Sequence, residues 1–463
     1  MSDALAPVLE RIDTDRDAAL RRLTEYLRIP SIGTDPAYNE HTRRAAQWAA
    51  DQLTSMGFDA AVRTTPGQPM VVARAEGPKD APTLLYYGHY DVQPPDPLDL
   101  WDSPPFDPVL VDAEHGKRIV ARGANDDKGQ SMAFFEAFRA WKAVHRSFPV
   151  TIKVLLEGEE ESGSPSLDPF LEANKAELAA DVAVISDSEA WDINTPAVTY
   201  MLRDLVYLEC TLHGPSHDLH SGMYGGGVVN PINALTKILG ALHDENGVVQ
   251  IPGFYDDVIE LSEVERKQWE SLGYDEKQFL AGAGLKTPTG EKGRTILERL
   301  WSRPTCDING IWGGYTGEGA KTVIPAHASA KISCRLVADQ DPRKVHTGLE
   351  QFLHERTPPD CRFEIKTHGL APAIRVPTDS KFLQVSLDAL KRVYGKEAVL
   401  MGCGGSIPVV GSIQRILGFD SLLVGLGLED DRIHSPNEKF ELRCFEMGIK
   451  SHAAILDAVG RLR

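Results

Sequence analysis

Short apolar runs that are followed at once by potential metal ligands constrain this 463-residue chain more than any other feature. The runs are rich in β-branched and aromatic residues, which predicts buried β-strands. Ligands of an open α/β sheet bind outside the carboxyl ends of its strands, so residues that follow separate strands can meet at one edge. Most of the candidates occupy such positions: His89 and Asp91, Asp126 and Asp127, the acidic run 159–161, Asp187, and His434. Such a set could hold two divalent cations.

The first 200 residues alternate between helical and strand-like patterns. In the segment 41–56, apolar residues recur at the spacing of one helical face. Strand-like runs occupy positions 70–75, 84–87, 151–156 and 182–185. This alternation predicts an α/β sheet with helices on its faces.

The pattern changes after residue 199. The following segment contains a glycine-rich loop, a polar insertion at 244–305 that we expect to form surface helices, and strand-like runs at 207–212 and 328–336. From about residue 375 the α/β pattern returns. Because a chain of this length is too long for one ordinary core, we predict two domains. A domain formed by 1–199 and 375–463 is interrupted by a smaller α+β domain at 200–374.

The composition argues against several classes of protein. The chain has 49 basic and 67 acidic residues, and its net charge of −18 disfavours a nucleic acid partner. No segment approaches the roughly 20 apolar residues that span a bilayer, and the N-terminus has helical apolar spacing rather than the uninterrupted core of a signal peptide. The six cysteines contain no CxxC pair, so we expect free thiols in a cytoplasmic protein.

Each candidate ligand also has an ordinary structural explanation. His89 and Asp91 point the same way from a strand, which would let Asp91 orient a ligating imidazole, but an isolated HxD pair is weak evidence. Asp126 and Asp127 precede an apolar helical pattern and could cap that helix. The remaining alternatives are a helix cap at Asp187 and a surface-loop histidine at His434.

The acidic cluster is harder to explain without a cation. Glu157 and the run 159–161 follow a predicted strand directly. Like charges 4 Å apart repel by about 1 kcal/mol in water and about 4 kcal/mol at an effective dielectric of 20. A solvated surface would tolerate this repulsion, whereas the edge of a cleft would need a cation. Mixed histidine and carboxylate ligands suit zinc, with manganese or cobalt as alternatives.

The chain resembles the carnosinase-like dinuclear metallopeptidases, a family that also includes aminoacylases, succinyl-diaminopimelate desuccinylase and glutamate carboxypeptidases. The resemblance covers most of the chain and implies a metallopeptidase catalytic domain, with a mixed sheet flanked by helices, interrupted by a lid and dimerisation domain. The matching segments are GHYDV at 88–92, GANDDKG at 123–129, EGEEESGS at 157–164, SDS at 186–188, DLHSG at 218–222, GAKTVIP at 319–325, GGSIP at 404–408 and HSPNE at 434–438.

The resemblance implies a complete set of ligands for two metal ions. Asp126 would be the carboxylate that bridges both ions. His89 and Asp187 would complete the shell of one ion, and Glu161 and His434 that of the other. The resemblance also implies a cis peptide bond between Asp126 and the residue that follows it.

The resemblance further implies which residues act on the substrate. Glu160 would be the general base, and Asp91 would orient the neighbouring metal-binding histidine. The sequence alone does not choose between His217 and His220, and either could be an ordinary loop histidine. The family pattern selects His220 as the group that stabilises the oxyanion, contributed from the partner subunit of a homodimer.

A further set of residues would bind the substrate. Thr322 and Arg335 resemble lid residues that contact its C-terminal carboxylate, a task that suits guanidinium. Gly405 and Ser406 belong to a glycine-rich segment that can present backbone N–H groups to an anion, although a plain tight turn would have the same sequence. His368 resembles a family histidine near the lid hinge.

These features predict a hydrolase that cleaves the peptide bond of dipeptides or short peptides with a free C-terminal carboxylate. The alternative on the same scaffold is an N-acyl-amino-acid deacylase, which would use the same metals with a more apolar acyl pocket. The GAKTVIP segment and the long insertion resemble the carnosinase branch more closely. A non-catalytic binding protein is disfavoured because every catalytic position is filled.

Overall fold

The computed structural model describes residues 4–405 and 407–462, and its contacts divide the chain into two compact units. One unit comprises Met1–Tyr200, Val376–Met401 and Ile407–Arg463, and the other comprises Met201–Arg375 and Gly402–Ser406. The sequence predicts that the whole of 375–463 belongs to the first domain. In the structure, the short segment Gly402–Ser406 instead belongs to the second unit, where the backbone N–H of Arg203 donates to the carbonyl of Cys403, with an N–O distance of 3.1 Å.

Most of a nine-stranded mixed sheet lies in the first unit, and its residues 201–202, 374–375 and 402–403 belong to the second. The order of the sheet is β1-β2-β6-β3-β7-β17-β8-β15, with β16 paired to β8. Strands β6, β3, β7 and β17 run parallel in the centre, and the outer pairs are antiparallel. The strands are β1 (Asp59–Arg63), β2 (Met70–Ala75), β3 (Thr83–His89), β6 (Thr151–Glu157), β7 (Val182–Ile185), β8 (Ala197–Leu202), β15 (Ile374–Arg375), β16 (Val399–Cys403) and β17 (Ser421–Gly425). The predicted mixed sheet and its four early strands are confirmed.

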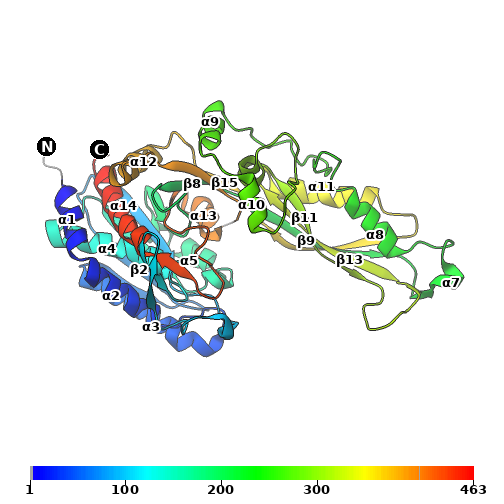
Figure 1. Ribbon diagram of the computed structural model, residues 1–463, viewed down its shortest axis with the longest axis horizontal. Coiled ribbons are helices and arrows are strands. Elements are labelled where there is room, and N and C mark those ends of the chain that lie inside the picture. Colours follow the sequence, from blue (N-terminus) through cyan, green and yellow to red (C-terminus); the bar gives the residue numbers. More distant parts are fainter. Residues whose placement is uncertain (1–3, 406, 463) are drawn as a thin grey trace. The chain divides into compact units, whose positions relative to one another are not determined.

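Helices cover this sheet, and the most deeply buried of them is α4 (Lys128–His145). Phe134 and Phe138 on α4 pack against Tyr86 of β3, with ring centroids 5.2 and 4.8 Å from that of the tyrosine. Helix α14 (Leu442–Gly460) packs against α4 and against α12 (Lys381–Tyr394) (Figure 1). A helix that is apolar on most sides belongs in a core, which explains why α4 lies between the sheet and its neighbours.

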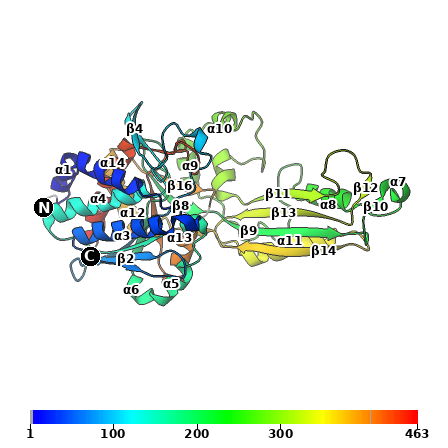
Figure 2. The ribbon, with the colours of Figure 1, turned by 90° about the horizontal axis from the view of Figure 1, so that it is seen from below.

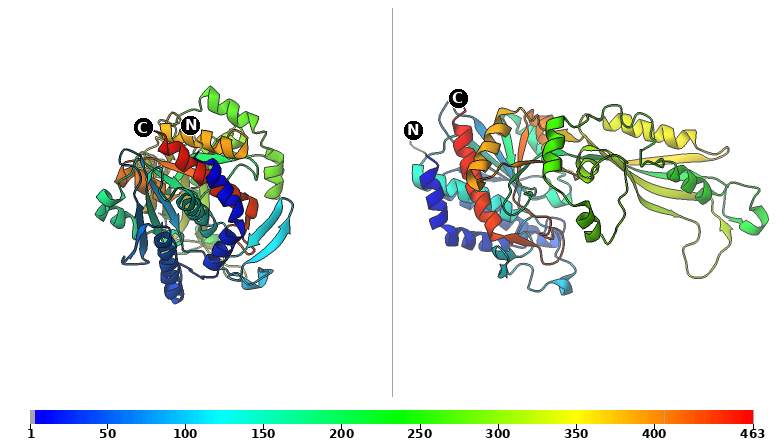
Figure 3. Two further views of the ribbon diagram at one scale, coloured as in Figure 1. Left: turned by 90° about the vertical axis from the view of Figure 1, so that its left-hand side faces the viewer. Right: turned by 45° about the horizontal axis from the view of Figure 1, so that its top comes forward.

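The N-terminal segment forms helices, as its apolar spacing predicts. Helix α1 (Ala6–Thr14) buries Val8 and Ile12 and contacts α14, and the two are seen together in Figure 3, in blue and red. The predicted helix at 41–56 is α3 (Asn39–Ser55). The other helices of the first unit are α2 (Arg16–Leu27), α5 (Leu167–Ala173), α6 (Lys175–Leu178) and α13 (Pro408–Ser412). Its shorter turns are η1 (Pro36–Tyr38), η2 (Leu98–Leu100), η3 (Glu160–Ser162) and η5 (Ile413–Leu417), and a small sheet contains β4 (Val109–Ala113), β5 (Gly116–Val120) and β18 (Lys439–Glu441).

The second unit is an antiparallel sheet in the order β11-β13-β9-β14. Its strands, seen side by side in Figure 2, are β9 (Asp204–His213), β11 (Thr305–Gly313), β13 (His327–Leu336) and β14 (Arg362–Leu370). Every second residue of β9 is buried, as expected of a sheet with one face on a core. That core includes residues of α8 (Pro231–Gly240) and α11 (Pro342–Glu355), which pack against the sheet.

Two further parts complete the second unit. Strands β10 (Leu219–His220) and β12 (Val323–Ile324) pair with each other and, together with α7 (Ser221–Tyr224) and Thr322, form what we term the arm. The polar insertion forms α9 (Glu263–Ser271), α10 (Glu276–Gly282) and the π-helical turn η4 (Glu298–Ser302). The helices expected in this insertion are therefore present.

The cysteine side chains are reduced, as the sequence predicts. The cysteines Cys210, Cys306, Cys334, Cys361, Cys403 and Cys444 are free thiols, and all but Cys361 and Cys403 are buried. Among the described residues, no helix has the length and apolar character needed to cross a membrane.

Candidate active site

The parallel strands bring several predicted site residues to one edge of the sheet. His89 is the last residue of β3, Asp187 lies two residues beyond β7, and the turn η3, which contains Glu160 and Glu161, follows β6. Because β6, β3 and β7 run in the same direction, their carboxyl ends lie together, and the side chains that follow them converge.

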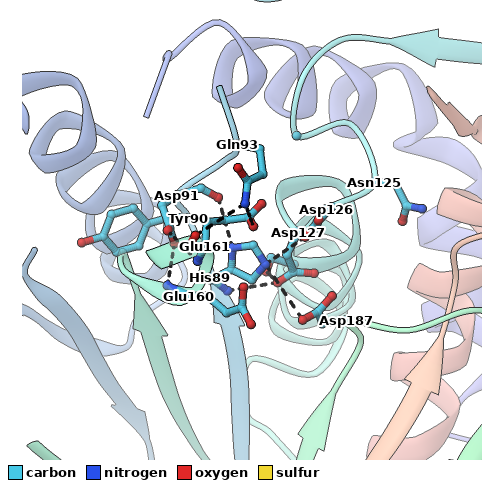
Figure 4. A network of polar contacts seen from close by, with 12 residues as sticks. His89, Tyr90, Asp91, Gln93, Asn125, Asp126, Asp127, Glu160, Glu161 and Asp187 are labelled. Atoms are coloured by element: carbon cyan, nitrogen blue, oxygen red, sulfur yellow. Dashed lines mark hydrogen bonds and ion pairs between the residues drawn. The ribbon is translucent and has the colours of Figure 1, made fainter. Parts of the chain in front are cut away.

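Asp126 lies at the centre of this group (Figure 4). Its Oδ1 is 3.0 Å from Nε2 of His89, and its Oδ2 is 2.9 Å from Nε2 of His434. Each oxygen of one carboxylate therefore faces a different imidazole. The peptide bond between Asp126 and Asp127 is cis, as the resemblance implies.

Two sets of potential ligands share Asp126. His89, Asp126 and Asp187 form one set, and Asp126, Glu161 and His434 form the other, with ligand atoms in each set within 4.8 Å of one another. Oε2 of Glu161 is 3.2 Å from Nε2 of His434, and Oδ2 of Asp187 is 4.0 Å from Nε2 of His89. The structure thus brings all five predicted ligands together in two overlapping groups.

The electrostatics of the cluster are those of a cation site. Burial and the nearby charge of Asp126 raise the pKa of Asp187 well above its usual value. Burial also raises the pKa of Glu160, and the carboxylates of Glu161 and Asp126 add to that effect. Hydrogen bonds to Asp126 and Glu161 raise the pKa of His434 to about 10. Cations among these groups would balance the carboxylates and leave the imidazoles neutral, the form that binds metal.

This donor set fits two divalent ions. It combines imidazole nitrogen with carboxylate oxygen, which suits zinc and its first-row neighbours. The carboxylate of Asp126 belongs to both three-residue groups, as a ligand that bridges two ions must.

Asp91 contacts His89 through both its backbone and its carboxylate. Nδ1 of His89 is 3.1 Å from the backbone carbonyl of Asp91 and 3.5 Å from its carboxylate Oδ1. The carboxylate also accepts hydrogen bonds from the backbone N–H groups of Glu160 and Glu161, at 3.3 and 3.1 Å. The free N–H groups of the short turn η3 attract this carboxylate, so Asp91 links the end of β3 to the turn that carries the predicted base.

The capping alternatives do not account for the aspartates. Asp127 precedes α4, but its side chain makes no capping hydrogen bond to that helix. Its Oδ2 accepts from the backbone N–H of His89 at 3.1 Å and from the hydroxyl of Ser131 at 2.6 Å. Asp127 therefore links the end of β3 to helix α4.

Gln93 is a residue of this site that our reading of the sequence missed. Its Nε2 donates to Oε2 of Glu161 at 2.7 Å, and Figure 4 shows the two side chains together. A glutamine four residues beyond a histidine has no spacing that marks it as functional. Only the HxD motif, which ends two residues before it, could have drawn attention to it.

The predicted site residues of the second unit fall into two groups. His220 and Thr322 belong to the arm, where the backbone N–H of Ser221 donates to the carbonyl of Thr322 at 3.1 Å. Nδ1 of His220 accepts from the backbone N–H of Gly222 at 3.0 Å, which leaves Nε2 free to face a ligand. The other histidine of this segment, His217, contacts the hydroxyl of Ser216 at 2.9 Å.

Arg335 and His368 lie at the opposite end of the sheet from the arm. Arg335 pairs with Leu205 at the start of β9, and His368 lies at a register shift of β14, with its ring 5.4 Å from that of Tyr207. The backbone N–H of Gly405 donates to Sγ of Cys403 at 3.4 Å. Ser406 lies outside the described residues.

The surroundings of Arg335 favour an anion. Its Nη1 is buried and has no hydrogen-bond partner in the described part of the chain. Burial, together with the positive charge of Arg335, lowers the pKa of Arg203 to about 10. A negatively charged ligand would relieve the repulsion between the two arginines and satisfy the buried donor.

The register of β9 separates Arg335 from the arm. Arg335 is opposite Leu205, and His213, at the other end of β9, pairs with His327, which follows β12 of the arm by three residues. In Figure 2 the arm strands β10 and β12 lie beyond that end of β9. Eight residues of extended strand span roughly 25 Å, whereas a dipeptide spans only about 7 Å. Arg335 and His220 of one chain are therefore too far apart to contact the same dipeptide.

The sequence and the structure of the chain are similar to those of known metallopeptidases. Residues 85–458 match the model of peptidase family M20/M25/M40. The chain is 34% identical to the Cys-Gly metallodipeptidase DUG1 of Saccharomyces cerevisiae, over 98% of this chain and 98% of the yeast protein. It is 31% identical to the Beta-Ala-His dipeptidase of Homo sapiens, over 99% and 93% of the two chains. The structure of the metallo-carboxypeptidase Sso-CP2 from Sulfolobus solfataricus is similar, with a TM-score of 0.81, 33% identity, and coverage of 96% of this chain and 99% of the other.

Proposed function

The chain belongs to peptidase family M20/M25/M40, and we propose that it is a dinuclear metallodipeptidase that cleaves dipeptides with a free C-terminal carboxylate. The observation that carries this proposal is the position of Asp126, whose two carboxylate oxygens face His89 and His434 separately. The names of its relatives support a dipeptide as the substrate, since a yeast and a human protein of nearly the same length are both dipeptidases.

Two metal ions would be held by the two overlapping ligand sets. His89, Asp126 and Asp187 would bind one ion, and Asp126, Glu161 and His434 the other. We propose zinc, because imidazole and carboxylate are its usual ligands, with manganese or cobalt as alternatives. When bound, such a pair lowers the pKa of a water molecule and polarises the carbonyl group of the substrate.

Glu160 would move the proton in this reaction. Its carboxylate would accept a proton from the attacking water and later donate it to the nitrogen of the departing amine. Burial and the neighbouring carboxylates raise the pKa of Glu160, which makes it a better base than an exposed glutamate. Asp91 holds the backbone N–H groups of both Glu160 and Glu161, so one residue would position the base and a metal ligand together.

The second unit would bind the substrate. Arg335, with its buried unpaired donor, would pair with the C-terminal carboxylate. Gly405 and Ser406 would add backbone N–H groups on the same substrate, and His368 would lie nearby. We propose a cytoplasmic location, in keeping with the free cysteine thiols.

The separation of Arg335 from the arm supports a shared site in a homodimer. We propose that His220 stabilises the oxyanion in the site of the partner subunit, because a His220 that served its own subunit would have to reach a substrate held at the far end of its own sheet. Thr322 would cross with it, since both residues belong to the arm.

The substrate class can be tested directly with a panel of compounds. We expect the purified protein with added zinc or manganese to hydrolyse unblocked dipeptides. N-acyl amino acids and dipeptides with an amidated C-terminus should react much more slowly. Release of amino acids, measured by chromatography, gives the rates. Faster hydrolysis of N-acyl amino acids than of every dipeptide would favour the deacylase alternative, and no hydrolysis with any metal would contradict an enzymatic function.

Removal of Arg335 should weaken recognition of the terminal carboxylate. We expect Arg335→Ala to lower kcat/KM by an amount that corresponds to about 2 kcal/mol or more of activation free energy, because a charge-assisted pair is lost. Amidation of the C-terminus of the substrate should strongly lower kcat/KM of the wild-type protein but lower that of the variant little further. Lys331→Ala, which removes an exposed cation of the same strand, serves as the control. Independent, additive losses from Arg335→Ala and from amidation would place Arg335 away from the carboxylate.

A further inference from the structure

The loop that carries His434 has a backbone that needs external support. Arg432, His434 and Asn437 all have positive φ angles, of 57°, 60° and 63°. Residues other than glycine rarely adopt this left-handed conformation and do so where the surrounding structure holds them there. The position of His434 therefore depends on the contacts that fix this loop.

Glu438 provides the most extensive of these contacts. It is fully buried, and its side chain reaches the loop 122–126, which carries Asp126. Its Oε1 accepts from the backbone N–H groups of Asn125 and Asp126, at 2.9 and 3.1 Å. Its Oε2 accepts from the backbone N–H of Gly123 at 2.8 Å and from Nη1 of Arg122 at 2.7 Å. One carboxylate thus binds four donors of a single loop.

Arg122 links the carboxylate of Glu438 to the loop that carries His434. Its Nη2 donates to the carbonyl of Ser435, the residue after His434, at 3.4 Å. A second link runs beside it, where Nδ2 of Asn125 donates to Oδ2 of Asp431 at 2.9 Å. The two loops that supply Asp126 and His434 are therefore joined through buried polar groups rather than through the ligands alone.

We propose that Glu438 is a positioning residue that fixes the distance between Asp126 and His434 and thereby sets the affinity for the ion held by Asp126, Glu161 and His434. This inference rests on the proposed function, because it requires that these residues bind a metal. Glu438 does not contact the metal-binding atoms themselves. It acts through the backbone of one ligand and the loop of another.

The substitution Glu438→Gln tests this role with little change in size. An amide oxygen can still accept from two of the four donors. The amide nitrogen, however, would face two donors, because every group that contacts this carboxylate donates. The two hydrogen bonds on the side of the amide nitrogen must then break, and the loop of His434 should lose its fixed position.

We expect one of two zinc ions to bind about 10- to 100-fold more weakly in the full-length Glu438→Gln protein, the range typical when a residue that orients a metal ligand is changed. Titration with zinc against a chelating dye measures the affinity of each ion, and thermal unfolding without metal reports stability separately. Glu136→Gln is the matched control. Glu136 is also buried and pairs through both oxygens with an arginine, Arg22, but it contacts neither ligand loop. The control should lose stability and keep both affinities.

A second variant covers the case in which Glu438→Gln does not fold. Arg122→Lys keeps a positive charge beside Glu438 but removes the planar guanidinium group that also reaches Ser435. We expect this variant to bind the same ion more weakly. Wild-type affinity for both ions in the folded variants would overturn the positioning role and leave the dinuclear function standing. Failure of the wild-type protein itself to bind two zinc ions would overturn both proposals.

Discussion

Glu160→Gln is expected to abolish nearly all turnover while the protein still binds about two metal ions per chain. The amide cannot accept the proton of the attacking water, and loss of a general base typically costs a factor of roughly 100 to 10,000 in rate. Glu160 is not part of either ligand set, so its removal should leave metal binding intact. Steady-state kinetics on a dipeptide and metal analysis of the same sample measure the two properties.

The neighbouring glutamates serve as controls for this variant. Glu159 is buried and accepts from the backbone N–H groups of Gln68 and Ser166, so we expect Glu159→Gln to affect stability rather than chemistry. Glu161→Gln should lose metal, because Glu161 contacts His434. If Glu160→Gln lost its metal and Glu161→Gln kept it, our assignments of base and ligand would be reversed.

The parts of the fold that could be predicted are those that depend on local patterns. Strands β2 and β7 begin and end where the apolar runs do, because both strands are buried on their two faces and allow few polar residues. The edge at which His89, Asp187 and Glu161 meet could also be predicted, since parallel strands place their carboxyl ends together.

The contacts that could not be predicted depend on tertiary structure. The carboxylate of Asp91 turns to the backbone of Glu160 and Glu161 because the turn η3 leaves N–H groups free there, and no spacing in the sequence indicates that choice. Glu438 bonds a loop more than 300 residues earlier in the chain. The register shift at His368 is likewise a property of the pairing between β14 and β9 rather than of the sequence around the histidine.

The assignment of His220 to the partner's site makes a separate prediction about oligomeric state. An isologous dimer, in which the same surfaces meet on both subunits, would let each arm enter the site of the other subunit. Homodimers of His220→Ala should then lose a factor of roughly 100 to 1,000 in kcat, because an oxyanion donor is missing from each site. Glu160→Gln homodimers should be inactive for a different reason, since they lack the base.

Mixed dimers of these two variants should regain activity. In a heterodimer, the subunit with intact Glu160 receives intact His220 from its partner, so that site is whole. Random pairing makes about half of the dimers mixed, each with one complete site of two, and activity should therefore recover to about a quarter of the wild-type value. Co-expression of the two variants with different affinity tags also isolates the heterodimer, whose activity should be about half of the wild-type value.

A second pair of variants shows whether any recovery comes from the exchange of arms. Glu160 and Asp187 both lie in the first unit, so the lesions of Glu160→Gln and Asp187→Asn each damage the site of their own subunit. No pairing of these two variants can assemble a complete site, and their mixture should stay inactive. If His220 instead served its own subunit, the mixture of Glu160→Gln with His220→Ala would be equally inactive, because each subunit would carry one lesion in its own site. Equal inactivity of the two mixtures would thus contradict the shared site, whereas recovery in the His220 mixture alone would require that the arm crosses between subunits.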